Sequence, residues 1–160
     1  METKKVNVKR LVVMIAIEIV VALLLFFVLL WPFRVSGISM EPRFSDGGVV
    51  VASRGMAWVG WINRGNVIIC RMEHYTERYT AIKRVIGLPG ERVVIYNGNV
   101  YVDGMPQEHL HETPGDVDIL LGRGEFFVLG DDRLTSYDSR FAGVVQRRDI
   151  IARVWFNRSW

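Results

Sequence analysis

Hydrophobic positions divide the chain into one long apolar run and a series of short alternating segments. The run covers residues 11–31, LVVMIAIEIVVALLLFFVLLW, and Glu18 is its only charged residue. About 20 apolar residues in a helix that rises 1.5 Å per residue span the roughly 30 Å hydrocarbon core of a bilayer. A buried helix this uniform is unusual in so small a domain, and a cleaved signal peptide has a shorter apolar stretch followed by small residues. We therefore predict a single transmembrane anchor over residues 11–31.

Beyond this run, short segments rich in Val and Ile alternate with turn residues, which is the pattern of β-strands. The clearest unit is a hairpin over residues 93–104, VVIYNGNVYVDG, because Asn97-Gly98 is a favoured two-residue type I′ turn. No amphipathic helix is evident there. The predicted fold class is therefore mainly β: a single N-terminal transmembrane helix followed by a compact all-β domain with a small hairpin extension. The other expected strands cover residues 47–53, 66–72, 80–87, 126–130 and 150–156.

Charge sets the expected orientation. Four of the 20 Lys and Arg residues precede the apolar run, and by the positive-inside rule they place the N-terminus in the cytoplasm. The domains predicted are a cytoplasmic basic tail (1–10), the anchor (11–31) and an extracytoplasmic β-rich domain (34–160). In the outer domain the remaining 16 basic residues nearly balance 15 acids, so the pI of about 9.2 gives no support to nucleic-acid binding. Glu18 is either a tolerated, protonated acid or the mark of a helix partner, which leaves the oligomeric state open.

Lys83 is the first candidate for chemistry. It is the only lysine beyond the apolar run, where the other 15 basic residues are arginine. A desolvated lysine can lose its proton at working pH, whereas arginine cannot. Strand alternation places Lys83 on the same face as Ala81 and Val85, so we expect its pKa to be lowered. The alternative is a charged lysine that protects a strand edge from aggregation.

Two further segments carry polar groups. Ser39 lies in SGISMEP (36–42), only eight residues beyond the apolar run, and GDDRLTSYDSR (130–140) concentrates acids, arginines and hydroxyls in one loop. Ser39 alone is compatible with an ordinary loop hydroxyl. The set of polar residues in 130–140 instead suggests a hydrogen-bonded scaffold, in which salt bridges could order the loop beside an active site. Cys70 is the only cysteine, so no intramolecular disulfide can form. His109 and His111 lack a convincing third ligand, so we predict no metal.

Together, SGISMEP, KRVIGLPGE (83–91) and GDDRLTSYDSR resemble the motifs of bacterial type I signal peptidases in order and approximate spacing. The apolar run and the β-rich remainder match too, so the resemblance covers essentially the whole chain, and its size is similar to the compact Gram-positive members. It implies that Ser39 is the nucleophile, Lys83 the general base and Ser136 the residue that orients the lysine, with no cofactor. The residues it implies for structural ion pairs are Asp131, Arg133, Asp138 and Arg140.

The same resemblance implies a membrane-anchored serine endopeptidase of the bacterial cell membrane with its catalytic domain outside the cytoplasm. Its partners would be the lipid bilayer and the signal peptides of exported preproteins, which it would cleave after small residues (Ala-x-Ala). An extended peptide can add to a sheet edge, with shallow pockets for small side chains. Adjacency to Ser39 and Lys83 makes Val35, Met40 and Ile82 the candidate pocket residues.

Three positions depart from the family pattern. Arg43 stands where Thr is frequent, Asn66 where Asp is usual, and Gly37 where some members use a serine hydroxyl to hold the oxyanion. With Gly37, the oxyanion hole would depend on backbone N–H groups, chiefly that of Ser39.

Two other functions remain open. A self-cleaving repressor of the LexA type would carry a DNA-binding helical domain, whereas this chain has the apolar run. A non-enzymatic assembly or chaperone factor for surface proteins is the main alternative, and it would not need an intact serine and lysine. The preferred preproteins, and a general as opposed to a specialised role, are open as well.

Overall fold

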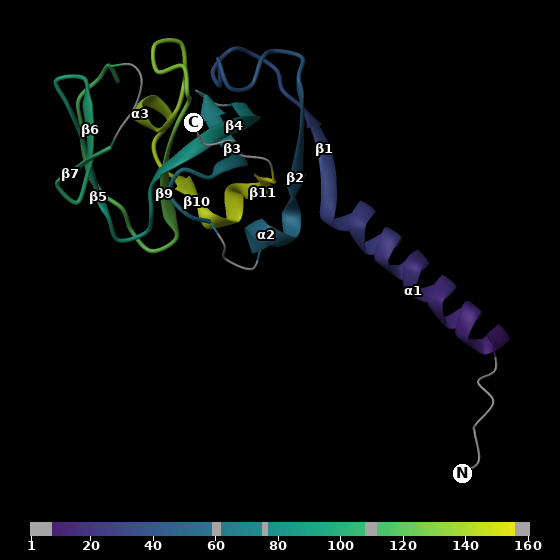
Figure 1. Ribbon diagram of the computed structural model, residues 1–160. Helices are drawn as coiled ribbons and strands as arrows, with labels where there is room; N and C mark the ends of the chain where they lie inside the picture. Colours follow the sequence, from purple (N-terminus) through teal and green to yellow (C-terminus); the bar gives the residue numbers. More distant parts are fainter. Residues whose placement is uncertain (1–7, 59–61, 75–76, 108–111, 156–160) are drawn as a thin grey trace.

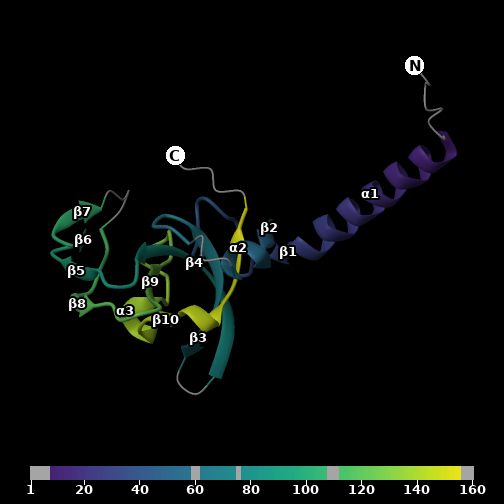
Figure 2. The same ribbon diagram turned by 90° about the horizontal axis from the view of Figure 1, so that it is seen from below.

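The computed structural model describes residues 8–58, 62–74, 77–107 and 112–155, which form one long helix and two β-sheets (Figure 1). Helix α1 (Val8–Leu29) projects away from the sheets, as the turned view in Figure 2 also shows. Its described side chains from Leu11 to Leu23 are exposed. Within the described residues, no helix is both long and apolar enough to cross a membrane. The anchor therefore stays a prediction from the sequence.

The larger sheet has seven strands in the order β1-β2-β11-β3-β4-β9-β10, and all of its pairings are antiparallel. The strands predicted for this sheet are confirmed, and β1 and β10 are additional. Leu30 and Trp31, expected within the anchor, begin β1 because they pair with Ser53 and Ala52 of β2. The bounds are β1 Leu30–Arg34, β2 Val49–Ser53, β3 Val67–His74, β4 Glu77–Gly87, β9 Glu125–Leu129, β10 Val145–Gln146 and β11 Ile150–Val154.

The smaller sheet has four strands in the order β7-β6-β5-β8. The predicted hairpin is confirmed: Asn97 and Gly98 both have positive φ (48° and 75°), as a type I′ turn requires. A second turn of this kind, Asp103-Gly104, adds β7, which the sequence analysis did not identify. The bounds are β5 Arg92–Tyr96, β6 Asn99–Val102, β7 Met105–Gln107 and β8 Val117–Leu120.

Short helical turns complete the described domain, which is mainly β. They were not anticipated, because segments of three to five residues carry almost no helical periodicity. The bounds are α2 Arg54–Trp58, α3 Ser139–Ala142 and the 3₁₀ turn η1 Arg147–Asp149.

Gly87 permits the close approach of the two sheets. A Cβ atom at this position would lie 2.5 Å from Val93 Cγ2 and 2.7 Å from Leu121 Cδ1. Both neighbours belong to a buried cluster in which the small sheet packs on β9 and the end of β4. The contact fixes the end of the strand that carries Lys83.

The substitution Gly87→Ala should lower the free energy of unfolding by about 1–3 kcal/mol, because one methyl group must displace two packed side chains. Urea unfolding at equilibrium measures this. Leu120→Ala, at a 70 % exposed position of the four-stranded sheet, is the control and should change stability by less than about 0.5 kcal/mol. Equal effects of the two substitutions would contradict the packing argument.

Candidate active site

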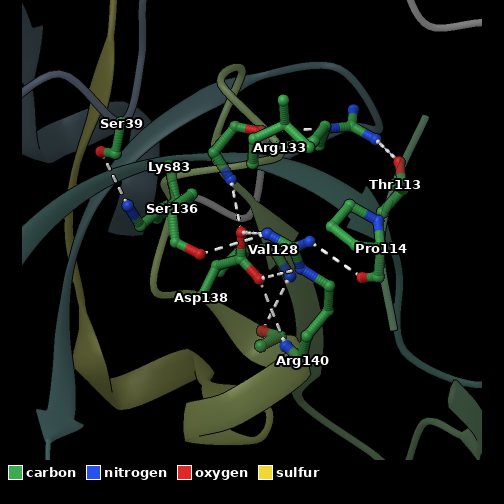
Figure 3. Close-up of polar contacts among 12 residues, drawn as sticks. Ser39, Lys83, Thr113, Pro114, Val128, Arg133, Ser136, Asp138 and Arg140 are labelled. Carbon is green, nitrogen blue, oxygen red and sulfur yellow. Dashed lines mark hydrogen bonds and ion pairs between the residues drawn. The ribbon is translucent and has the colours of Figure 1, made fainter. Parts of the chain in front are cut away.

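Ser39 and Lys83 are in direct contact: Lys83 Nζ lies 2.8 Å from Ser39 Oγ (Figure 3). Lys83 comes from the middle of β4 and is only 4 % exposed. Ser39 is half-buried in the turn that follows β1, where Glu41 N–H donates to Ile38 O. The fold thus brings together two residues that are 44 positions apart in the sequence.

Burial controls the charge of Lys83. Desolvation is the largest effect and lowers the pKa of the amine, with a smaller lowering from Arg140. Asp138, Cys70 and Asp131 act in the opposite direction without reversing the shift. Burial also raises the pKa of the Cys70 thiol to about 12, so this side chain stays protonated and uncharged at neutral pH. Ser39 therefore faces an amine that loses its proton more readily than an exposed lysine does.

Gly130 allows the 130–140 loop to lie directly against Ser39. A Cβ atom at Gly130 would lie 2.5 Å from the carbonyl oxygen of Ser39, and still closer to the side chain of Ser136. The Asp132 N–H donates to the same carbonyl oxygen at 3.1 Å. Sequence analysis did not single out Gly130; its place after a buried strand and before a polar cluster was the available signal.

Ser136 is 3 % exposed, and its Oγ makes no hydrogen bond within the described residues. Its backbone N–H donates to Asp132 O, which holds the residue next to Gly130. The expected hydrogen bond between Ser136 and Lys83 is not formed in this structure. The hydroxyl is nevertheless a neighbour of the serine–lysine contact, since Gly130 touches both Ser136 and Ser39.

The polar loop contains one buried ion pair of its own. Arg140 donates from Nε and Nη2 to the two carboxylate oxygens of Asp138, at 2.8 and 2.9 Å. Asp138 is fully buried and also accepts from the Gly130 N–H at 3.0 Å. Figure 3 shows this carboxylate facing the guanidinium group of Arg140. A buried charge pair is tolerated when its remaining hydrogen-bonding sites are satisfied in this way.

The other two charged residues of the loop have different partners. Asp131 pairs with Arg84, whose Nε and Nη2 donate to its two carboxylate oxygens. Arg133 forms no ion pair that the structure records; it donates to Gly130 O at 2.9 Å and to Thr113 Oγ1 at 2.7 Å. Sequence analysis missed Arg84 and Thr113. Arg84 could have been suspected from its place beside Lys83 in the same motif.

The three candidate pocket residues lie in one apolar cluster on the opposite face of β4 from Lys83. Val35 and Met40 are 4 % and 0 % exposed, and only Ile82 keeps partial exposure. Of the three, Ile82 is therefore the side chain with surface to offer a ligand.

Two of the three departures from the family motifs, Gly37 and Asn66, have local explanations. Gly37 has a φ of 91°, which favours glycine, and its N–H donates to Asp46 Oδ1 at 2.8 Å. Asn66 Oδ1 accepts from Asn63 N–H at 2.9 Å and so closes the turn before β3. His109 and His111 lie outside the described residues.

Comparison with known proteins identifies the family. The family model described as "Signal peptidase, peptidase S26" matches residues 8–158. Signal peptidase I U of Bacillus subtilis (strain 168) is 31 % identical over 164 residues, which cover 92 % of this chain and 86 % of that protein. Signal peptidase I of Bacillus caldolyticus is 33 % identical over 79 % and 77 % of the two chains. A crystal structure of a signal peptidase I from Enterococcus faecalis V583 superposes with a TM-score of 0.49 at 25 % identity, over 57 % of this chain and 94 % of that chain.

The lowered pKa of Lys83 predicts how stability depends on pH. Between the folded pKa and the ordinary value of 10.5, the unfolded chain holds a proton that the folded chain lacks, so stability rises with pH in this window. Lys83→Met removes this dependence. The stability of the variant relative to the native chain should therefore be greatest below the folded pKa of Lys83, and should decline as pH rises toward 10.5.

Chemical denaturation of both proteins at a series of pH values measures this difference. Arg92→Met, at an exposed arginine, is the control and should show a constant difference across the window. A difference between Lys83→Met and the native chain that does not vary with pH would contradict the assignment.

Proposed function

Because this chain belongs to the signal peptidase S26 family and is a type I signal peptidase, a serine peptidase, we propose that it removes signal peptides by a Ser39–Lys83 dyad. The observation that carries the proposal is the 2.8 Å contact between Ser39 Oγ and a buried lysine amine of lowered pKa. A serine hydroxyl is a weak nucleophile until a nearby base accepts its proton. Lys83 can be that base only when it is uncharged, which its burial favours.

The reaction would proceed in two steps. In the first, neutral Lys83 takes the proton of Ser39 as Oγ attacks the scissile carbonyl, and the resulting ammonium then gives a proton to the leaving amine. The product is an ester between Ser39 and the signal peptide. In the second, Lys83 takes a proton from a water molecule that attacks the ester, and the signal peptide is released as a carboxylate. Ser39 regains its proton from Lys83.

Negative charge on the carbonyl oxygen would be held by backbone donors. Within the described residues, the Ser39 N–H has no recorded acceptor, so it is free for this role. Gly37 supplies no side chain, in keeping with a backbone oxyanion hole. Each well-placed donor of this kind is worth about 3–4 kcal/mol of transition-state stabilisation in serine proteases.

An open strand edge beside the dyad would hold the substrate. Strand β4 pairs with β9 only from Arg84 to Gly87, whereas its earlier residues pair with β3 alone among the described strands. An extended peptide could hydrogen-bond along residues 78–82 and reach Ser39 at the end of this stretch. Ile82, partly exposed at this position, would help to restrict the cleaved side to small residues such as Ala-x-Ala.

We also propose that the enzyme works at a bilayer through the apolar run 11–31, with the sheets on the extracytoplasmic side. The described side chains of α1 are exposed over several turns, and an apolar surface of this extent calls for a lipid or protein covering. Further exposed apolar side chains lie on β2 (Val49 and Val51) and at the end of β11 (Trp155). The proposed nucleophile lies in the turn after β1, and β1 is the strand that continues directly from α1.

Cleavage of a purified preprotein with an Ala-x-Ala site, in detergent, tests the proposed chemistry. The native chain should cut after the second alanine, and Ser39→Ala and Lys83→Ala should each lower the rate by roughly three orders of magnitude or more. The native rate should rise with pH through the folded pKa of Lys83, below 10.5. Arg92→Ala, at an exposed residue of the four-stranded sheet and outside the proposed substrate edge, is the activity control.

Folded native protein that leaves several preproteins intact between pH 7 and 10 would contradict the proposal. The non-enzymatic assembly factor would then be the better description. Retained cleavage in either dyad variant would instead reject the assigned mechanism and leave the peptidase function standing.

A further inference from the structure

A cavity of about 190 Å³ lies between the two sheets, and three arginine residues are part of its wall. It has room for several water molecules at about 30 Å³ each, or for one small ion. None of the described residues that line it is acidic. Its wall includes Arg64, Arg84 and Arg133 together with Val85, Val100 and Gln107.

The positive charge around this arginine cavity exceeds the negative charge bound to it. Arg64 pairs with Glu91 at 2.7 Å, and Arg84 pairs with Asp131. Both carboxylates lie outside the cavity lining. Arg133, in contrast, donates only to the neutral acceptors Gly130 O and Thr113 Oγ1 in the contacts that the structure records. Among the described residues, the recorded ion pairs of these three guanidinium groups involve two carboxylates, Glu91 and Asp131.

Arg133 is the least favourable of the three charges. It is 6 % exposed, and burial lowers its pKa, with further lowering from Arg140 and Arg84. Asp131 and Asp138 offset part of this effect. The two recorded hydrogen bonds use Nε and Nη1, and Nη2 is not among the buried polar atoms that lack a partner. Arg133 lines the cavity, and its Nη2 has no recorded hydrogen bond among the described residues.

We propose that the arginine cavity binds a small soluble oxyanion, of the size and charge of phosphate. Arginine donors in a planar fork match the oxygens of phosphate and carboxylate groups, and a bound anion would compensate the excess charge. The four-stranded sheet, which supplies Val100 and Gln107, lies on the far side of the molecule from α1 in both views (Figures 1 and 2). This position favours a free ion over a phospholipid headgroup.

An ion in this cavity would act on the dyad through one backbone group. Arg133 Nε donates to Gly130 O, and Gly130 is in close contact with both Ser39 and Ser136. Fixing Arg133 would therefore restrain the loop that borders the nucleophile. This consequence rests on the proposed function, whereas binding of the ion does not.

Thermal unfolding of the full chain in detergent, titrated with inorganic phosphate at constant ionic strength, tests the binding. The melting temperature should rise with phosphate and saturate, since a ligand that binds only the folded state stabilises it. Chloride at the same ionic strength should give no saturable rise. Arg133→Met should weaken phosphate binding by ~10-fold or more, because it removes a charged donor, and Arg133→Lys should recover part of it.

Gln107→Glu tests the site where Arg133→Met fails to fold. It places a carboxylate in the cavity wall with almost no change of shape, so it should also weaken phosphate binding ~10-fold, through repulsion and competition for the arginines. Arg92→Met removes an exposed arginine of the same sheet and should bind phosphate like the native chain. Native-like phosphate binding by Gln107→Glu would overturn the proposal, and so would an equal rise of melting temperature with chloride.

The source of the anion is tested with vesicles. Phosphatidylglycerol vesicles should not replace phosphate. They should raise the melting temperature no more than phosphatidylcholine vesicles do, both in the native chain and in Gln107→Glu. Stabilisation by phosphatidylglycerol alone, lost in this variant, would overturn the assignment to a soluble ion. Because all these readouts are melting temperatures, they are independent of whether preproteins are cleaved.

Discussion

Burial of a single lysine amine is the constraint on which the rest of the site depends. Lys83 is almost fully removed from water on a strand face shared with apolar side chains, and the recorded hydrogen-bond partner of its Nζ is Ser39 Oγ. A charged amine in such a place is costly, so the structure favours the form that can accept a proton. The proposed base is produced by the packing of the sheet.

The buried charges around Ser39 and Lys83 bring little net charge to the lysine amine. Asp138 alone would raise the pKa of Lys83, but its carboxylate is engaged by both nitrogens of the Arg140 fork and by the Gly130 N–H. Arg140 itself lowers the pKa of Lys83. The ion pair therefore brings little net charge to the lysine, while it fixes the loop that covers it. A structural role and an electrostatic role are combined in the same pair of side chains.

Backbone contacts set the position of Ser39, the proposed nucleophile. Ser39 lies in a turn, and turns are held less firmly than strands unless other groups restrain them. Here Asp132 N–H and the bare Cα of Gly130 meet the Ser39 carbonyl group, and Arg133 ties Gly130 to Thr113 in the segment before β8. The small sheet is thereby linked to the proposed catalytic residues, which gives a route by which an ion between the sheets would affect the proposed reaction.

Local sequence determined the strands with clear alternation, the Asn97-Gly98 hairpin, and the special status of Lys83 as the lone lysine of the outer domain. These features are determined by short segments of sequence, because strand periodicity and turn geometry depend on neighbours in the chain. The partners of the charged loop were decided only by tertiary structure: Asp131 bonds Arg84, while Arg133 bonds Thr113. Strand register and loop packing determine which arginine meets which partner, because the arginines are alike in their local sequence. Residue type therefore indicated which groups could react, and the fold alone decided which of them meet.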